Sequence, residues 1–153
     1  MTLFRHFSDE LIIPLARVVE TQEVQPSDVI FEEGTAGRDL KIVRTGTVRI
    51  ARSTPVGTQV LTTLSTGALF GEVSYLDDLP RSATAFAASE TSLYSIPADA
   101  LDAAVAEDRE LAVSLLWGFW QTLASKVRSA NAQMNELFGA PSTELPDGGG
   151  DTV

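Results

Sequence analysis

Between Thr21 and Pro97 the chain alternates short β-prone runs with turn residues, and this alternation constrains the fold more than any other feature of the sequence. The β-prone runs are Val29–Phe31, Leu40–Thr45, Val48–Ser53, Val60–Leu64, Ala83–Ala88 and Ser92–Ile96. Glycine, proline and small polar residues separate them, as at Thr45-Gly46-Thr47 and Pro55-Val56-Gly57. Many short strands with regular turn signals are typical of an antiparallel sandwich or jelly roll. We therefore expect a β-roll over residues 21–97.

Helical patterns flank and interrupt this region. Residues 8–20 predict a short helix that Ser8 caps, and Pro14 either kinks this helix or restarts it. Within the β region, residues 69–76 indicate a glycine turn that leads into a brief helix. Beyond Pro97 the pattern predicts a short helix over 98–106 and a long one over 109–138.

The sequence thus predicts an α+β fold, an antiparallel β-roll of the double-stranded β-helix type with helical additions. These are a short N-terminal helix, the brief helix inside the β region, the short helix over 98–106 and the long C-terminal helix. We expect residues 1–138 to form one domain, with its helical part at 98–138. Residues 139–153 contain Pro141, Pro146 and three consecutive glycines, so we expect a disordered tail.

The long helix carries an apolar seam that a single domain does not require. Its seam residues are spaced 4, 3, 4, 3, 4, 3, and they are Leu116, Trp120, Leu123, Val127, Ala130, Met134 and Leu137. This spacing is that of a coiled-coil heptad and favours a homodimer formed through residues 116–137. Leu111, Leu115 and Phe119 form a neighbouring stripe suited to packing on the chain's own β-roll. The alternative is one wide core-facing stripe.

Charge and composition exclude several functions. The 153 residues carry 21 acidic and 11 basic side chains, a formal net charge of −10, which argues against a nucleic-acid partner. The absence of cysteine excludes disulfides and thiolate sites and fits a reducing cytoplasm. The single histidine, His6, argues against a metal centre or a histidine-dependent enzyme. No apolar run is long enough to span a membrane, and we find no signal peptide.

The segment from Phe70 to Ala83 combines groups that suit an anionic sugar ligand. Gly71 allows a turn into a helix start, where free N–H groups can bind an anion. Arg81 can pair with phosphate oxygens, whereas Glu72 would repel a phosphate but accepts a hydrogen bond from a sugar hydroxyl. A 3′,5′-cyclic nucleotide offers both the phosphate and a free 2′-hydroxyl. The alternative is an internal Arg81–Glu72 ion pair that only fixes this segment.

At these residues the sequence resembles the phosphate-binding cassette of cyclic-nucleotide-binding domains, the family of the catabolite activator protein and the protein kinase A regulatory subunits. Phe70-Gly71-Glu72 and Pro80-Arg81-Ser82-Ala83 match the two halves of its F-G-E and P-R-[STA]-A pattern. The resemblance extends over residues 8–138, including Glu33-Gly34 and Gly46-Thr47-Val48. One departure is Lys41, at a strand position that is often aromatic in the family.

The resemblance implies a role for each cassette residue. Arg81 would pair with the exocyclic phosphate oxygen, Glu72 would accept from the ribose 2′-hydroxyl, and Ser82 would donate to the phosphate. Backbone N–H groups at Gly71 and Glu72 would help to hold the phosphate and sugar. The complete set of expected site residues in the cassette is Phe70, Gly71, Glu72, Val73, Arg81, Ser82 and Ala83.

The resemblance also implies where the base is recognised. A threonine at the position of Ser82 favours cGMP in the family, so Ser82 favours cAMP without excluding cGMP. The base usually packs against the final helix, where Asn131 is the candidate contact and Ser129 and Arg128 are alternatives, from the same chain or from a partner subunit.

The remaining charged residues are interpreted as solvated. Asp77 and Asp78 lack a third oxygen ligand at a spacing suited to Ca²⁺, so we expect no metal site and no cofactor. The basic residues of the β region are expected on a solvated strand face; they are Lys41, Arg44, Arg49 and Arg52.

The sequence therefore predicts a non-enzymatic cyclic-nucleotide sensor that dimerises through its last helix. Only 15 residues follow Phe138, too few for the DNA-binding module found after this helix in the family's transcription factors. We expect the output to reach an effector protein, unless the chain is a fragment of a larger one. Two alternatives remain, an interaction module of the same fold that binds no ligand or a different one, and a cupin-type enzyme, which the lone His6 disfavours.

Overall fold

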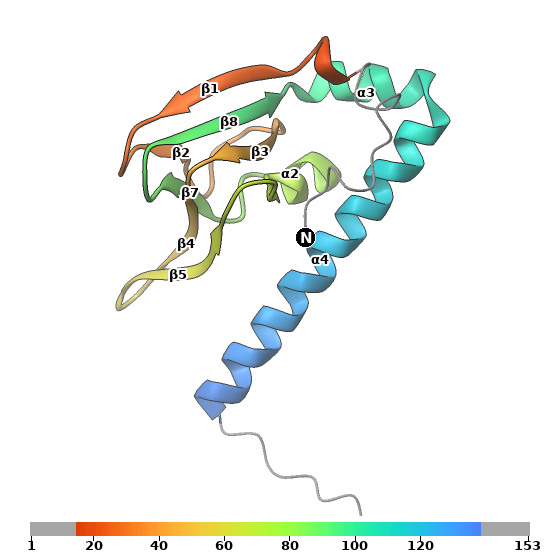
Figure 1. Ribbon diagram of the computed structural model, residues 1–153. Helices are drawn as coiled ribbons and strands as arrows, with labels where there is room; N and C mark the ends of the chain where they lie inside the picture. The colour runs from red at the N-terminus through yellow and green to blue at the C-terminus, as the bar shows by residue number, and fades with distance from the viewer. Residues whose placement is uncertain (1–14, 139–153) are drawn as a thin grey trace, which may run out of the picture. The chain divides into compact units, whose positions relative to one another are not determined.

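The computed structural model describes residues 15–138, and within this range it contains two four-stranded antiparallel sheets and three helices. The first sheet has the strand order β1-β8-β3-β6, and the second has the order β2-β7-β4-β5. Figure 1 shows them as separate layers of one β-roll. The strands are β1 Glu20–Val24, β2 Val29–Phe31, β3 Leu40–Thr45, β4 Val48–Thr54, β5 Gly57–Leu64, β6 Leu69–Phe70, β7 Thr84–Ala87 and β8 Thr91–Ile96. The predicted α+β roll is confirmed.

The helices also follow the predicted pattern. The brief helix α2 spans Glu72–Asp77 between β6 and β7, α3 spans Ala98–Glu107, and α4 spans Arg109–Phe138. Gly71 precedes α2 with a φ of 80°, a left-handed conformation that favours glycine. The predicted glycine turn into a short helix is therefore confirmed.

The predicted N-terminal helix, over residues 8–20, was wrong at its C-terminal end. The helix expected over residues 8–20 cannot extend to Glu20, because this residue begins β1 and pairs with Ser95 of β8. Residues 15 and 16 are helical, whereas Ser8 and Pro14 lie outside the described residues. The sequence pattern does not predict β1, because its residues, Glu20–Val24, are mostly polar and become a strand only by pairing with β8.

The two faces of the first sheet enclose different cores. Along β3, Leu40 and Ile42 face one way and join the cluster that includes Leu101 of α3 and Phe119 of α4. Val43 faces the other way, into the roll, with residues of the second sheet. That inner cluster consists of Val24, Val43, Val48, Ile50, Phe70, Ala83, Ala85, Ala87 and Leu93. The helices thus cover the outer face, and the inner face is left to the interior of the roll.

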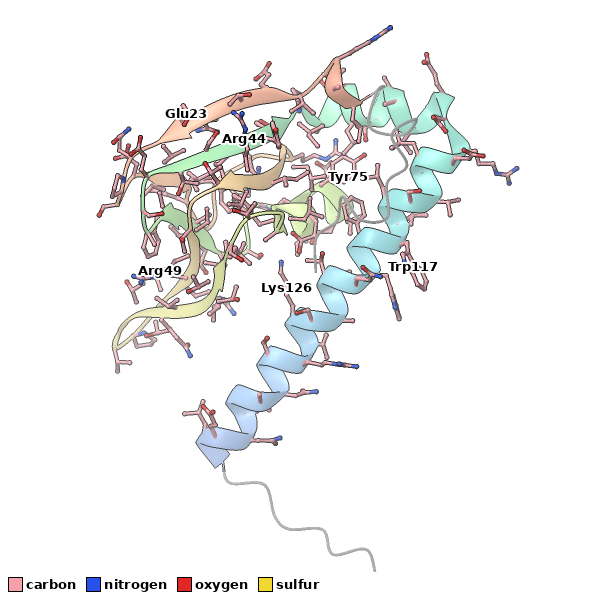
Figure 2. The ribbon with its side chains drawn as sticks, in the orientation of Figure 1. Glu23, Arg44, Arg49, Tyr75, Trp117 and Lys126 are labelled. Carbon is pink, nitrogen blue, oxygen red and sulfur yellow. The ribbon has the colours of Figure 1, made fainter. Side chains whose placement is uncertain are left out.

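The first part of α4 packs as its sequence predicts. Leu111, Leu115 and Phe119 are all buried within the outer cluster. The described residues up to Phe119 form one compact unit, and those from Trp120 onward form another. On the same helix, Trp117 is 56% exposed and points away from the sheets (Figure 2). None of the helices that the structure describes is long and apolar enough to cross a membrane.

Candidate functional site

The site begins at the end of β6, where Phe70 and Glu72 are both buried beside the turn at Gly71. Phe70 is 1% exposed, and Glu72, the first residue of α2, is fully buried. A fully buried carboxylate is unusual in a protein interior and requires polar or charged surroundings. Val73 is half-buried and Ser82 is exposed, whereas Ala83 is buried just before β7. The cassette residues named from the sequence thus lie along the segment that runs from β6 through α2 to β7.

Arg81 lies in the loop between α2 and β7 and is held by backbone carbonyls. The residue is 5% exposed. It donates from Nη1 to the Gly71 carbonyl at 3.2 Å and from Nη2 to the Asp39 carbonyl at 3.0 Å. The guanidinium also lies 4.2 Å from the centre of the Phe31 ring, a cation–π contact. Arg81 therefore joins the start of α2 to the start of β3.

Burial and nearby carboxylates act in opposite directions on Arg81. Burial, the larger effect, lowers its pKa, and the charges of Asp39 and Glu72 raise it. Glu72 is therefore close enough to act electrostatically on the guanidinium. The sequence alone leaves open whether Arg81 is structural or binds a ligand. Its hydrogen bonds to the carbonyls of Gly71 and Asp39 give it a structural role.

Two glycines make room for the guanidinium. A Cβ at Gly71 would lie 2.8 Å from Nη1 of Arg81, and a Cβ at Gly37 would lie 3.2 Å from Nη2. The main chain of Arg81 is fixed as well, because its N–H donates to the Thr35 carbonyl and its carbonyl accepts from the Gly34 N–H, both at 2.8 Å. The loop between β2 and β3 thus positions Arg81 from two sides, which the sequence motif alone does not indicate.

A second set of contacts, also absent from the sequence analysis, surrounds the end of α2. Tyr75, labelled in Figure 2, donates from its hydroxyl to Oδ1 of Asp102 in α3 at 2.8 Å and lies 5.9 Å from the ring of Phe119. Burial and the hydrogen bond with Asp102 raise the pKa of Tyr75 to about 12. The cassette helix is therefore tied to α3 and to the first part of α4.

Arg38 completes this second set. Its Nη2 donates to the Tyr75 carbonyl at 3.1 Å, and its Nε lies 3.2 Å from Oδ1 of Asp78. Its Nη1 donates to Oδ2 of Asp102 at 3.4 Å. Asp78 was expected to be a solvated turn residue, and it does lie exposed, but it also pairs with Arg38. These partners are 27 to 64 residues apart in sequence, so no local pattern could have found them.

One sequence expectation in the β region is wrong. Arg44, Arg49 and Arg52 are exposed as predicted, but Lys41 is only 9% exposed. Its Nζ donates to Ser95 Oγ at 2.6 Å and to Gln22 Oε1 at 3.3 Å. A signal was available, because Lys41 stands in the apolar run of β3, where both faces of the strand are buried. Burial is the main cause that lowers the pKa of Lys41.

The residues expected to contact the base lie on the last part of α4. Asn131, Ser129 and Arg128 are exposed on α4 beyond Trp120, in the unit separate from Arg81 and Glu72. Within the described residues, no group of three or more histidine, cysteine or acidic side chains is arranged to hold a metal ion.

Comparison with known proteins places these features in context. Residues 21–108 match the family described as cyclic nucleotide-binding domain. The chain is 32% identical over 131 residues to the "CRP-like cAMP-activated global transcriptional regulator" of Mycobacterium tuberculosis, a match that covers 82% of the chain and 57% of that relative. It is 34% identical over 85 residues to the "cAMP-dependent protein kinase regulatory subunit" of Yarrowia lipolytica, which covers 56% of the chain and 22% of the relative.

Solved structures give the same picture. A cyclic nucleotide-binding domain from Methylobacillus flagellatus superposes with a TM-score of 0.79 at 27% identity, covering 85% of this chain and 74% of that one. The Thermus thermophilus catabolite activator protein superposes with a TM-score of 0.73 at 29% identity, covering 88% and 62%. The chain spans little more than half the length of the M. tuberculosis relative that it matches.

Proposed function

Because the chain belongs to the cyclic nucleotide-binding domain family, a regulatory rather than a catalytic one, we propose that it is a cyclic-nucleotide sensor whose ligand is held by Arg81 and Glu72. One observation carries the proposal. Arg81 is a buried cation whose hydrogen bonds, at 3.0 and 3.2 Å, go to neutral carbonyls, and it lies within electrostatic reach of the buried Glu72. The charges of Asp39 and Glu72 already act on Arg81, and we infer that its guanidinium, now bonded to neutral carbonyls, forms stronger charge-assisted hydrogen bonds to a phosphate.

Each residue has a distinct task in this proposal. Arg81 pairs with the exocyclic oxygen of the cyclic phosphate, and Glu72 accepts from the ribose 2′-hydroxyl. Ser82, which is exposed beside Arg81, donates to the phosphate, as do backbone N–H groups at Gly71 and Glu72. Phe70, Val73 and Ala83 supply the apolar surroundings of the sugar. Asn131, with Ser129 or Arg128 as alternatives, is proposed to contact the base. We expect cAMP to bind more tightly than cGMP because Ser82 stands where a threonine would favour cGMP.

Calorimetry with cAMP, cGMP and 2′-deoxy-cAMP tests the assignment of Glu72. We expect Glu72→Ala and removal of the 2′-hydroxyl each to weaken binding by about tenfold or more, the cost of one hydrogen bond to a charged group. Because both changes remove the same hydrogen bond, their effects should not add. Glu33→Ala, at a carboxylate that contacts Arg52 and the Ser53 N–H, serves as the matched control.

Two outcomes of this experiment would contradict the proposal. An absence of heat with cAMP and cGMP at high micromolar concentrations would refute the sensor function. Additive effects of Glu72→Ala and the 2′-deoxy ligand would refute the role of Glu72 while leaving the function intact.

The alternative is an interaction module of the same fold that binds no cyclic nucleotide. It is favoured if Arg81 serves only to join Gly71 and Asp39, which its present hydrogen bonds accomplish. Absorbance near 260 nm after denaturation of the purified protein separates the two functions, because a co-purified nucleotide supports the sensor.

We further propose that the sensor is a homodimer formed through residues 116–137 of α4. Six of the seven seam residues are exposed, among them Leu116 at 62%, Trp120 at 66% and Leu137 at 72%, and Leu123 is half-buried. A run of large apolar residues on one stripe is unfavourable in water and typical of a helix that pairs with another.

We expect light scattering to report a dimer that Val127→Glu converts to a monomer. Ser125→Glu, at the position farthest from the seam, should leave the dimer intact, and a monomer at high concentration for the unaltered chain would contradict the proposal.

The output is proposed to reach an effector protein in the cytoplasm. The net charge of −10 disfavours a DNA surface, although a matched relative is named a transcriptional regulator. Fluorescence anisotropy with labelled duplex DNA, at 50 mM salt and with saturating cAMP, tests this point. We expect no binding, and salt-dependent binding would overturn it.

A further inference from the structure

Phe31, the last residue of β2, is a half-buried aromatic residue to which the cassette pattern gives no role. Its ring centre lies 4.2 Å from Cζ of Arg81, well inside the distance of roughly 6 Å at which a guanidinium is attracted to an aromatic face. The attraction is electrostatic, because the face of the ring carries partial negative charge. It strengthens where water is excluded, and Arg81 is only 5% exposed. Phe31 is therefore in direct contact with the cation of the candidate site.

Neighbouring residues hold the ring of Phe31 in place. It lies 5.8 Å from the ring of Phe70, tilted by 37°, and it packs against the inner core of the roll. Its backbone stands opposite Ala85 of β7, in the second sheet, whereas Phe70 belongs to the first sheet. Phe31 thus contacts both halves of the cassette, Phe70 in the first half and Arg81 in the second.

Other arginines of the described residues also lie over aromatic rings, but at longer distances and nearer to solvent. Cζ of Arg38 is 5.2 Å from the ring centre of Tyr75, and the Arg38 side chain is 32% exposed. Cζ of Arg44 is 5.7 Å from the ring centre of Tyr94, and Arg44 is exposed. The contact of Arg81 with its ring is both closer and more deeply buried than these two.

We propose that Phe31 is a positioning residue of the cyclic-nucleotide site, which holds the guanidinium of Arg81 in the orientation that a bound phosphate requires. This inference rests on the proposed function. Hydrogen bonds from Nη1 and Nη2 to the carbonyls of Gly71 and Asp39 already hold one end of the group. The ring restrains the guanidinium in a different way, because stacking on an aromatic face uses no N–H donor. An arginine that is restrained before the ligand arrives loses less side-chain entropy on binding, so the ligand binds more tightly.

Calorimetry with cAMP on Phe31→Leu measures what the ring contributes, because leucine is apolar but has no aromatic face. We expect Phe31→Leu to bind cAMP about three- to tenfold more weakly than the unaltered chain, the cost of ordering one long side chain on binding. Phe86→Leu is the matched control, because Phe86 is a half-buried phenylalanine of β7 that stands opposite Val29. The control should leave the affinity unchanged. Equal affinities for Phe31→Leu and the unaltered chain would overturn the proposal.

A double substitution tests whether Phe31 acts through Arg81. If it does, Phe31→Leu should cause no further loss of affinity in the Arg81→Ala variant, because the side chain that it positions is gone. A ring that only supports the fold around the cassette would instead weaken binding by the same factor with or without Arg81. That result would refute the positioning role.

Nuclear magnetic resonance observes the restraint on Arg81 without any ligand. Relaxation of the ¹⁵N-labelled arginine Nε–H groups reports motion on the picosecond to nanosecond scale, and Arg81→Lys assigns the signal. We expect an order parameter of about 0.8 for Arg81 in the unaltered chain, close to that of a rigid backbone, and a value lower by about 0.2 in Phe31→Leu. An order parameter below about 0.6 in the unaltered chain would contradict the proposal.

Fluorinated phenylalanines at position 31 separate the charge of the ring face from the volume of the ring. One, two and three fluorine atoms withdraw successively more charge from the face and change the size of the ring little. We expect the affinity for cAMP to fall with each added fluorine atom, because the attraction on the guanidinium weakens. An affinity that is independent of fluorination, or that rises with it, would overturn the proposal.

The outcomes separate this inference from the function on which it rests. Normal binding of cAMP that is equal in Phe31→Leu and the unaltered chain would refute the role of Phe31 and leave the sensor intact. An unaltered chain that binds neither cAMP nor cGMP would refute both. Thermal unfolding followed by circular dichroism controls for folding. If Phe31→Leu does not fold, the fluorinated series and the relaxation of Arg81 in the unaltered chain decide.

Discussion

The two ends of the cassette helix α2 each meet a buried or half-buried arginine, and the two arginines differ in their partners. At the start of α2, Arg81 donates to the carbonyls of Gly71 and Asp39. At the end of α2, Arg38 meets the carboxylates of Asp78 and Asp102 and the carbonyl of Tyr75. Arg38 is thus neutralised by charges of the chain itself and is exposed over 32% of its side chain.

This difference indicates two kinds of task. An arginine that already pairs with two carboxylates has no need of a further anion, so Arg38 serves to connect the loop before β3, α2 and α3. Arg81 instead donates to two carbonyls while the charges of Asp39 and Glu72 act on it, and we propose that its guanidinium also pairs with an incoming phosphate. Binding of a ligand at the start of α2 would then affect the contacts at its end, because both ends belong to one six-residue helix.

The largest expected effect separates the two arginines directly. Arg81→Ala should weaken cAMP binding by about 100-fold, because it removes a charge-assisted pair to the phosphate in buried surroundings. Arg38→Ala should change the affinity by less than about fivefold, since its partners are protein carboxylates. Calorimetry on both variants makes the comparison, and equal losses would show that the two arginines do not divide the tasks as proposed.

A somewhat smaller effect is expected from Gly71→Ala. Its φ of 80° strains any side chain, and its Cβ would lie 2.8 Å from Nη1 of Arg81 and 2.9 Å from the Asp39 carbonyl oxygen that accepts from Arg81. We expect a loss of about 1–2 kcal/mol in the free energy of unfolding, from the left-handed conformation, and a loss of cAMP affinity of about tenfold or more. Gly57→Ala is the matched control, because Gly57 has a φ of 129° but nothing within 4 Å of its Cβ. If the control lost as much affinity, backbone strain and not the displaced guanidinium would be the cause.

The contacts at the end of α2 should affect stability more than binding. Arg38→Ala is expected to lower the free energy of unfolding by about 1 kcal/mol, since its ion pairs are partly exposed, and the melting temperature by roughly 2–4 °C. Urea unfolding measures this change. Arg44→Ala, at an exposed arginine that lies 5.7 Å from the Tyr94 ring centre, is a suitable control with a smaller expected loss. An unchanged stability for Arg38→Ala would show that the contacts of Arg38 contribute nothing to the fold.

The smallest expected effect is a pH dependence at Tyr75. Its pKa in the folded protein, about 12, lies above the usual value of 10.0, so the folded state holds the phenol proton more tightly. The stabilisation is therefore fully present below pH 10 and is lost as the pH rises from about 10 to about 12. In Tyr75→Phe this part of the alkaline loss should disappear, with Tyr94→Phe as control. Melting curves at pH 8 and pH 11 measure it, and an identical alkaline loss in Tyr75→Phe and the unaltered chain would refute this account.

Local sequence patterns predicted strands and helices with the correct bounds where the spacing of apolar residues decides the structure. The runs Val29–Phe31 and Leu40–Thr45 were predicted with the observed bounds, as was the long helix Arg109–Phe138. The cassette resemblance is confirmed at the level of the family, and its phosphate-binding assignments stay predictions. Strand β5 begins at Gly57, three residues before the predicted Val60, because the polar residues Gly57–Gln59 pair with β4 across the hairpin.

By itself, the sequence determined most of the strands, the helices from α2 onward and the family, because these depend on periodicity, turn residues and a contiguous motif, whereas β1 was not predicted. Tertiary structure decided which charges are buried and what they meet. Lys41 became a buried residue because both faces of β3 are covered, and Arg38 found Asp102 across 64 residues of chain. Such contacts arise only when the sheets and helices pack together, since no local pattern encodes which side chains the packing will bring into reach.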